Sequence, residues 1–249
     1  MTPTSPASNF PLAEETYPFW GWQDLALFLG AAAPAVLGSS LLVILVRRLA
    51  GQGLWNKALE VLLVQFLAYG FWFLALYAIF HFRHSRPFWD SLAWSGSTHD
   101  IAASLMVGPL LALVVAVSAA FLATPKVDTP LQELLNDRVS VFLVGVFATT
   151  LGPLCEELSF RGFLMPLVAR AAGPVLGIVL AAAPFAILHG PQYGWSWRHL
   201  LLVGLAGVAF GWTRYRTGST AAATAMHATY NLTFFAGFLL FEGDTLRPW

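Results

Sequence analysis

The sequence predicts an all-α polytopic membrane protein with seven or eight transmembrane helices. Of its 249 residues, 57% are hydrophobic and 10% are charged, whereas soluble domains carry roughly 25% charged residues. Uncharged apolar runs recur along the chain, and most of them reach the length of about 20 residues that a helix needs to cross a bilayer. Because lipid offers no partners for backbone polar groups, these runs must be helices rather than open strands.

The charge-poor runs predict seven spans. In chain order they are residues 25–46, 61–82, 101–124, 139–172, 175–188, 199–213 and 218–241. We expect Gly152, Pro153 and Pro166 to bend or break the fourth span, and counting it as two gives eight. Residues 125–138 are polar and predict a loop that carries a short surface helix. Gly207 and Gly211 form a small-xxx-small pattern, which is typical of close helix packing.

The ends of the chain and its composition exclude several classes. Residues 1–23 lack the basic start and early apolar core of a signal peptide, so they predict a flexible N-terminal tail. Residues 242–249 predict a C-terminal tail. The net charge of zero gives no sign of a nucleic-acid partner. The single cysteine, Cys155, excludes an intramolecular disulfide and a multi-cysteine metal site.

Three charged residues, Glu156, Glu157 and Arg161, lie inside one apolar tract. A charge at the bilayer centre costs at least ~2.5–3.5 kcal/mol, so such residues are rare and usually functional. Successive helix positions point about 100° apart, so the two carboxylates cannot face the same point. Arg161 follows Glu157 at i+4, which predicts a buried ion pair that leaves Glu156 unpaired. Alternatively, Arg161 anchors a neighbouring helix.

Three later polar residues, His189, His227 and Asn231, lie within or at the end of apolar spans. If a helical hairpin turns at residues 172–173, Glu156 and His189 each lie about 16 residues, or about 24 Å, from the turn. They can therefore face each other at similar depth. His227 and Asn231 stand at i and i+4, so they share one helix face and can point into a common cavity.

These residue types suit the hydrolysis of a peptide bond by water. A buried, unpaired Glu156 is suited to act as a general base, and His189 can share the proton of a water held between them. His227 and Asn231 are donors suited to a developing oxyanion, a role worth roughly 3–4 kcal/mol per donor. The natural substrate is a membrane-tethered protein or peptide, which can be brought to this depth.

The polar residues form three motifs in a fixed order: Glu156-Glu157-x-x-x-Arg161, Phe185-x-x-x-His189 and His227-x-x-x-Asn231. This pattern resembles the signature of the CPBP family, which contains the CAAX prenyl proteases and the bacteriocin-processing or abortive-infection-like membrane proteins. The resemblance implies an intramembrane endopeptidase in which Glu156 and His189 activate the water. It implies an oxyanion site at His227 and Asn231.

In the same resemblance, Glu157 and Arg161 are structural support. Phe185 itself is an aromatic residue that we expect to pack rather than to take part in the chemistry. Residues 139–241 become the catalytic core, preceded by N-terminal transmembrane helices over residues 24–138. Some members have been described as metalloproteases, but the sequence lacks the His-Glu-x-x-His zinc pattern. We therefore predict no metal ligand and no cofactor.

Two other function classes stay open on the sequence. One is a non-catalytic immunity or scaffold protein that binds transmembrane segments in the same cavity. The other is a transporter with a Glu/His proton relay, against which the lack of paired, inverted broken helices counts. Eleven Arg against two Lys, with abundant Ala, indicate a GC-rich bacterial genome and hence a multi-pass protein of the plasma (inner) membrane.

Overall fold

The computed structural model describes residues 17–51, 55–127, 134–135 and 137–242. Within these ranges every regular element is a helix, as the composition predicts. The elements are α1 (Trp22–Ala50), α2 (Lys57–Ala78), the π-helical turn η1 (Ile79–Arg83), α3 (Phe88–Ser91), α4 (Thr98–Phe121), α5 (Arg138–Thr149), α6 (Leu151–Glu157), the π-helical segment η3 (Leu158–Leu164), α7 (Met165–Ala172), α8 (Pro174–Leu188), the 3-10 turn η4 (Pro191–Tyr193), α9 (Trp197–Thr217) and α10 (Thr220–Glu242).

Four helical segments of the described chain are long and apolar enough to cross a membrane: Trp22–Ala50, Lys57–Arg83, Thr98–Phe121 and Arg138–Ala172. Pro174–Leu188 is apolar but shorter, with 15 residues. Helices α9 and α10 occupy the last two predicted spans. The all-α membrane architecture is confirmed, whereas the count of seven or eight crossings stays a prediction. The surface helix expected within residues 125–138 falls largely outside the described residues.

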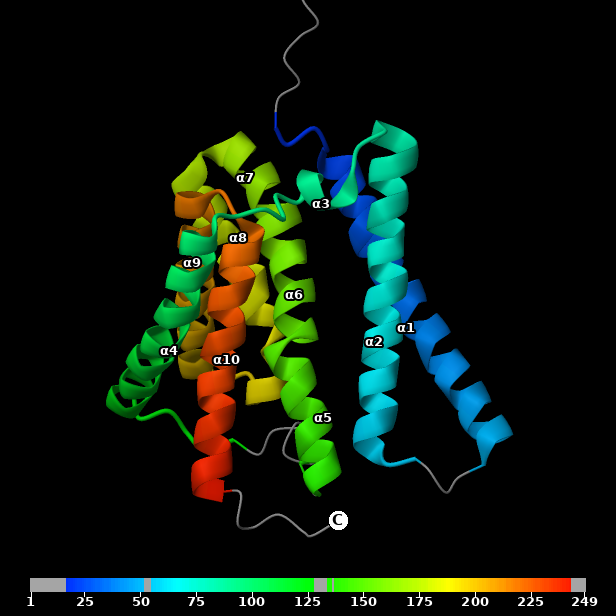
Figure 1. Cartoon of the computed structure of the whole chain (residues 1–249), viewed down its shortest axis with the longest axis vertical. Coiled ribbons are helices and arrows are strands. Elements are labelled where there is room, and N and C mark those ends of the chain that lie inside the picture. The colour runs from blue at the N-terminus through cyan, green and yellow to red at the C-terminus, as the bar shows by residue number, and fades with distance from the viewer. Residues whose placement is uncertain (1–16, 52–54, 128–133, 136, 243–249) are drawn as a thin grey trace, which may run out of the picture.

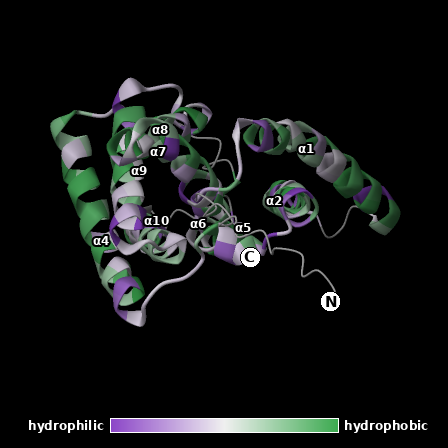
Figure 2. Cartoon of the chain, turned by 90° about the horizontal axis from the view of Figure 1, so that it is seen from above, coloured by the Kyte–Doolittle hydropathy of each residue, from purple (hydrophilic) through white to green (hydrophobic). Residues whose placement is uncertain are grey.

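The helices form one bundle with a two-helix arm at its side (Figure 1). Both views place the α5–α6 segment between the α1–α2 pair and α10, and α10 packs along α4, α9 and α5 (Figures 1 and 2). Figure 2 shows hydrophobic residues dominating α1 and α4, which flank the bundle. Outward apolar side chains are what a lipid-facing surface requires, and α1 exposes Leu37, Leu41 and Leu49.

Short polar caps fix where several helices begin. Asn56 accepts a hydrogen bond from the Leu59 backbone N–H at 2.7 Å, and Asp137 accepts one from the Ser140 N–H at 2.9 Å. Each cap supplies an acceptor to an N–H that has no partner inside the first helical turn. Gly173 ends α7 at φ 87°, a backbone conformation that favours glycine, and so permits the sharp turn into α8.

The fourth predicted span is broken where the prolines require it. Thr150, at φ −129° and ψ −78°, separates α5 from α6. Pro153 has no N–H for the carbonyl four residues earlier, that of Thr149, and its ring crowds that carbonyl. Pro166 acts likewise on the preceding turn, where the Met165 N–H bonds to the Phe160 carbonyl in the π-helical η3. The break expected near Gly152 and Pro153 is therefore confirmed at Thr150, whereas the chain stays helical through Pro166 after the π-helical η3.

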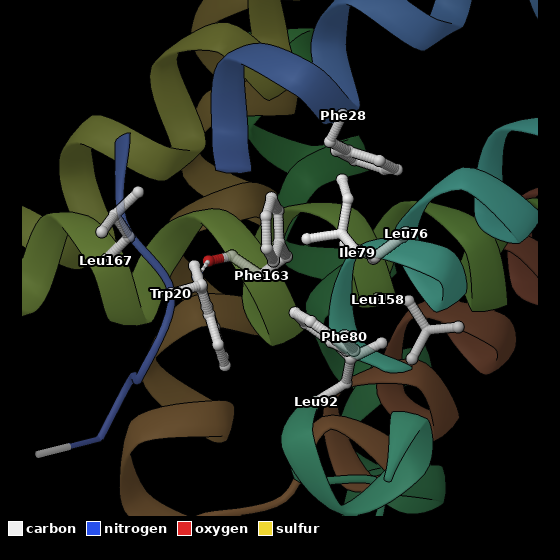
Figure 3. Packing of buried hydrophobic residues seen from close by; sticks show 9 residues of the cluster. All are labelled: Trp20, Phe28, Leu76, Ile79, Phe80, Leu92, Leu158, Phe163 and Leu167. Atoms are coloured by element: carbon white, nitrogen blue, oxygen red, sulfur yellow. Dashed lines mark hydrogen bonds between the residues drawn. The ribbon is translucent and has the colours of Figure 1, made fainter. Parts of the chain in front are cut away.

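A hydrophobic core of aromatic and aliphatic side chains joins α1, α2 and the η3–α7 segment. Figure 3 shows its nine residues, with Trp20 and Phe163 side by side; they are Trp20, Phe28, Leu76, Ile79, Phe80, Leu92, Leu158, Phe163 and Leu167. The Trp20 ring stacks on Phe163 at 5.3 Å, and its indole N–H donates to the Phe163 carbonyl at 3.1 Å. Residues 17–21, within the predicted flexible tail, are thus part of the packed fold, because Trp20 is fully buried and its indole N–H is satisfied.

Arg170 and Arg214 hold this N-terminal segment from the side of the bundle. Arg170 donates to the backbone carbonyls of Pro18 and Trp20, the latter at 2.9 Å. Arg214 donates to the Tyr17 hydroxyl at 3.2 Å. The segment before the first helix is therefore bound to α7 and α9, which belong to the later half of the chain.

Candidate functional site

The two adjacent glutamates of α6 face different surroundings, as their angular separation requires. The Glu157 side chain is 0% exposed, whereas the Glu156 side chain is 26% exposed. Glu156 can therefore be reached by a water or a substrate, and Glu157 cannot. This difference supports the sequence-based division between a free carboxylate and a structural one.

Glu157 accepts two hydrogen bonds through the same oxygen, Oε1. One comes from Arg161 Nη1 at 2.8 Å and the other from His227 Nδ1 at 2.9 Å. The i,i+4 ion pair predicted from the sequence is thus confirmed. The second partner was not predicted, and it connects the α6–η3 segment to α10.

Arg161 both pairs with Glu157 and anchors a neighbouring helix, so the two alternatives raised by the sequence hold together. Its Nη2 donates to the Gly207 carbonyl of α9 at 2.7 Å, and the whole residue is 1% exposed. Three aromatic rings surround the guanidinium, with ring centroids 4.5 to 5.9 Å from its central carbon: Phe160, Phe185 and Phe210. The ion pair, the hydrogen bond and the aromatic contacts together offset the desolvation penalty of the buried guanidinium.

His227 lies between the two glutamates. With Glu157 ionised beside Arg161, its Oε1 can only accept, so the hydrogen in the 2.9 Å contact belongs to His227 Nδ1. The other ring nitrogen, Nε2, lies 3.8 Å from Glu156 Oε2. The carboxylate of Glu157 thereby directs the second nitrogen of His227 toward Glu156, which is how an orienting carboxylate acts on a catalytic imidazole.

His189 ends α8 and is oriented in a comparable way. Its Nδ1 bonds to the Phe185 carbonyl at 2.7 Å, one turn earlier. A carbonyl can only accept, so Nδ1 carries the hydrogen and Nε2 is left as an acceptor. The Phe185 ring lies 4.7 Å from the His189 ring and 5.9 Å from the His227 ring, so both histidines contact one aromatic side chain. That His189 shares a water with Glu156 stays a prediction.

Asn231 has a structural partner that the sequence did not indicate. Its Nδ2 donates to the Ala148 carbonyl at 2.8 Å. This carbonyl lies in the last turn of α5, where the break at Thr150 leaves carbonyls without helical donors. Asn231 therefore caps α5 with one amide hydrogen and keeps a second one. His227 and Asn231 both bond to the α5–α6 segment, which confirms that they share one face of α10. Their predicted role as oxyanion donors stays a prediction.

Helix α9 contributes contacts that the motif pattern does not contain. Phe210 stacks on His227, and the Gly207 carbonyl binds Arg161. A Cβ at position 207 would lie 3.1 Å from Arg161 Nη2 and from the Phe185 ring. The small-xxx-small pattern predicted close packing of this helix correctly. It gave no sign that the packing partner is the site itself.

No group of three or more His, Cys, Asp or Glu side chains in the described part of the chain is arranged to hold a metal ion. Glu156 and His227 come together as a pair, while Glu157 is engaged by Arg161. Zinc sites use three or four protein ligands, so the residues present do not fit one. Independence from metals and cofactors stays a prediction.

Part of the chain matches a known protein family. Residues 138–233 match the family described as type II CAAX prenyl endopeptidase Rce1-like. No curated protein and no solved structure matches the chain. The matched range contains all six residues assigned to the site from the sequence, and the family indicates a protease that acts on a membrane-associated protein. Together with the apolar helices, this supports an integral membrane protein whose residues 138–233 are similar to the type II CAAX prenyl endopeptidase Rce1-like family.

Proposed function

We propose that the protein is an intramembrane endopeptidase that hydrolyses a peptide bond of a membrane-tethered protein or peptide with a water activated by Glu156. The observation that carries the proposal is the Glu157–His227–Glu156 arrangement. A fully buried carboxylate holds one nitrogen of His227, and the other nitrogen faces the partly exposed carboxylate of Glu156. An arrangement that served only to bury an ion pair would have no need of the accessible carboxylate.

The proposed reaction begins with a water beside Glu156. The carboxylate takes one proton from the water, and the resulting hydroxide attacks the carbonyl carbon of the scissile peptide bond. His189 Nε2, an acceptor once Nδ1 is bonded to Phe185, holds the remaining hydrogen of that water. The carbonyl oxygen becomes an oxyanion, for which the second amide hydrogen of Asn231 is the proposed donor. Collapse of the tetrahedral intermediate breaks the C–N bond, and the proton on Glu156 passes to the leaving amine.

The family description gives the first substrate class to test. It names a CAAX prenyl endopeptidase, so we propose a peptide bond near the C-terminus of a lipid-tethered protein. Such a tail is anchored in the bilayer, which would bring the scissile bond to the level of the buried site. Tethered peptides without a prenyl group are the alternative class.

The test is cleavage of fluorogenic tethered peptides, prenylated and acylated, by the purified protein in liposomes. We expect Glu156→Gln to lower kcat by roughly 10²–10⁴-fold, the usual contribution of a general base. Glu60→Gln is the matched control, because Glu60 lies in α2 and pairs with Arg47 of α1. Full cleavage by Glu156→Gln would refute the mechanism. Binding of both peptides without cleavage by the wild type would favour the non-catalytic scaffold.

A further inference from the structure

Phe210 packs face to face on the imidazole of His227. The two rings lie 4.4 Å apart between centroids with an interplanar angle of 18°. Phe210 is 1% exposed, and its ring also meets the Tyr230 ring edge-on at 5.6 Å and 82°. The Phe210 ring therefore cannot turn freely, and it presents a fixed plane to the imidazole.

We propose that Phe210 is a positioning residue that sets the plane of the His227 imidazole and so directs its Nε2 at Glu156. The inference rests on the proposed function and adds to it a residue of α9, outside the three motifs. Besides the hydrogen bond at Nδ1, the imidazole meets the Phe185 ring edge-on at 5.9 Å, and neither contact covers its face against tilting about χ2, which is a broad torsion. The stack removes that freedom, because tilting would drive the imidazole into the Phe210 ring.

The position of Phe210 is itself fixed by the site. Gly207 lies three residues earlier, on the same side of α9, and its carbonyl is held by Arg161 Nη2 at 2.7 Å. The Phe210 ring also lies 5.4 Å from the Arg161 guanidinium carbon. Arg161 thus holds Glu157, which binds one edge of His227, and α9, which supplies the ring on its face. The hydrogen bond from His227 to Glu157 and the Phe210 stack are therefore both supported by the buried guanidinium of Arg161.

The first test compares ring removal at two stacked pairs. Phe210→Leu keeps an apolar side chain but removes the plane, and Phe210→Tyr keeps the plane. Phe28→Leu is the matched control, because Phe28 is 2% exposed and stacks on Trp72 at 4.4 Å and 2°, so the same change removes a buried stacked ring that does not lie on a histidine. We expect Phe210→Leu to lower kcat by roughly ten- to a hundredfold with KM nearly unchanged, since a misplacement of about 1 Å can cost that much. Phe210→Tyr restores kcat, and Phe28→Leu leaves both constants at the wild-type value.

The second test needs no activity and no folded variant at position 210. In protein labelled with ¹³C-histidine, the Cε1–H signal of His227 is expected upfield of that of His99, because the His227 ring lies over an aromatic face and the His99 side chain is 90% exposed. His227→Gln and His99→Gln identify the two signals. A His227 signal at the position of the His99 signal would overturn the inference.

The two tests separate this inference from the proposed function. If Glu156→Gln abolishes cleavage while Phe210→Leu cleaves normally, the positioning role is wrong and the proposed function stands. If Glu156→Gln cleaves normally, the proposed function is wrong. A kcat loss in Phe210→Leu that Phe28→Leu reproduces would also overturn the inference, since the loss would then follow from weakened packing in general.

Discussion

The buried pair of Arg161 and Glu157 allows a quantitative prediction. The two side chains are 1% and 0% exposed, and Arg161 also donates to the Gly207 carbonyl. Replacing Arg161 by Met removes the cation and leaves the charge of Glu157 without compensation. Breaking one partner of a buried pair costs about 3–5 kcal/mol, so we expect Arg161→Met to lower the free energy of unfolding by that amount.

The double variant separates the charge effect from the packing effect. Arg161→Met with Glu157→Gln removes both charges, and the amide oxygen introduced at position 157 can still accept from His227 Nδ1. We expect it to be more stable than Arg161→Met alone, with a coupling free energy of about 0.5–3 kcal/mol. Arg47→Met is the control, because Arg47 is 42% exposed and its pair with Glu60 should contribute no more than about 1 kcal/mol after solvent screening.

The assay is denaturant unfolding in detergent micelles, followed by tryptophan fluorescence, of the wild type, the double variant and the single variants Arg161→Met, Glu157→Gln and Arg47→Met. Equal losses in Arg161→Met and Arg47→Met would refute the reasoning, since burial would then add nothing to the worth of the charge. So would a double variant whose loss equals the sum of the losses in Arg161→Met and Glu157→Gln.

Three further outcomes are expected. Trp20→Phe keeps an aromatic ring but leaves the buried Phe163 carbonyl without the indole donor, which should cost about 1–3 kcal/mol in the free energy of unfolding measured by denaturant titration; an unchanged midpoint would contradict it. Gly108→Ala should lower the melting temperature, because its Cβ would overlap the Met226 carbonyl of α10, whereas the same change at Gly70 meets nothing within 4 Å and should not. Hydrogen bonds from Ser140 hold the pKa of Asp137 below its ordinary value of 3.8, so this cap contributes stability above that value and loses it as pH falls through the depressed pKa; Asp137→Asn should remove that part of the acid dependence in melting scans at graded pH.

The sequence carried enough information for the helices and for the local ion pair. Charge-free runs located the long helices, and the i,i+4 spacing of Glu157 and Arg161 specified a contact inside one turn. The break before Glu156 followed from Pro153, whose effect on the preceding turn is intrinsic to the residue. All these features depend on neighbours within a few positions along the chain.

Contacts between helices were predicted less well. His227 and Arg161 both donate to Glu157 Oε1. This arrangement depends on how α10 lies against α6, which the spacing of residues along the chain does not determine. Asn231 was expected only as an oxyanion donor. In the structure its amide also donates to the Ala148 carbonyl, which lies next to the break after α5. Phe210 looks like any core aromatic in the sequence, because nothing in the pattern of α9 distinguishes a ring that packs on a histidine from one that packs on leucine.

The bond from the Trp20 indole to the Phe163 carbonyl has a consequence for biogenesis. It spans 143 positions of the chain. Chains enter the membrane during synthesis with their earlier parts first, so α1 is in place long before its acceptor has been made. Until then the Trp20 indole N–H lacks this partner. The α1–α2 pair can pack against the rest of the bundle through this bond only after the α5–α7 segment has inserted. Packing of α1 and α2 against the bundle is consequently a late step in assembly. In a chain stalled on the ribosome before residue 163, these helices would lack this packing partner.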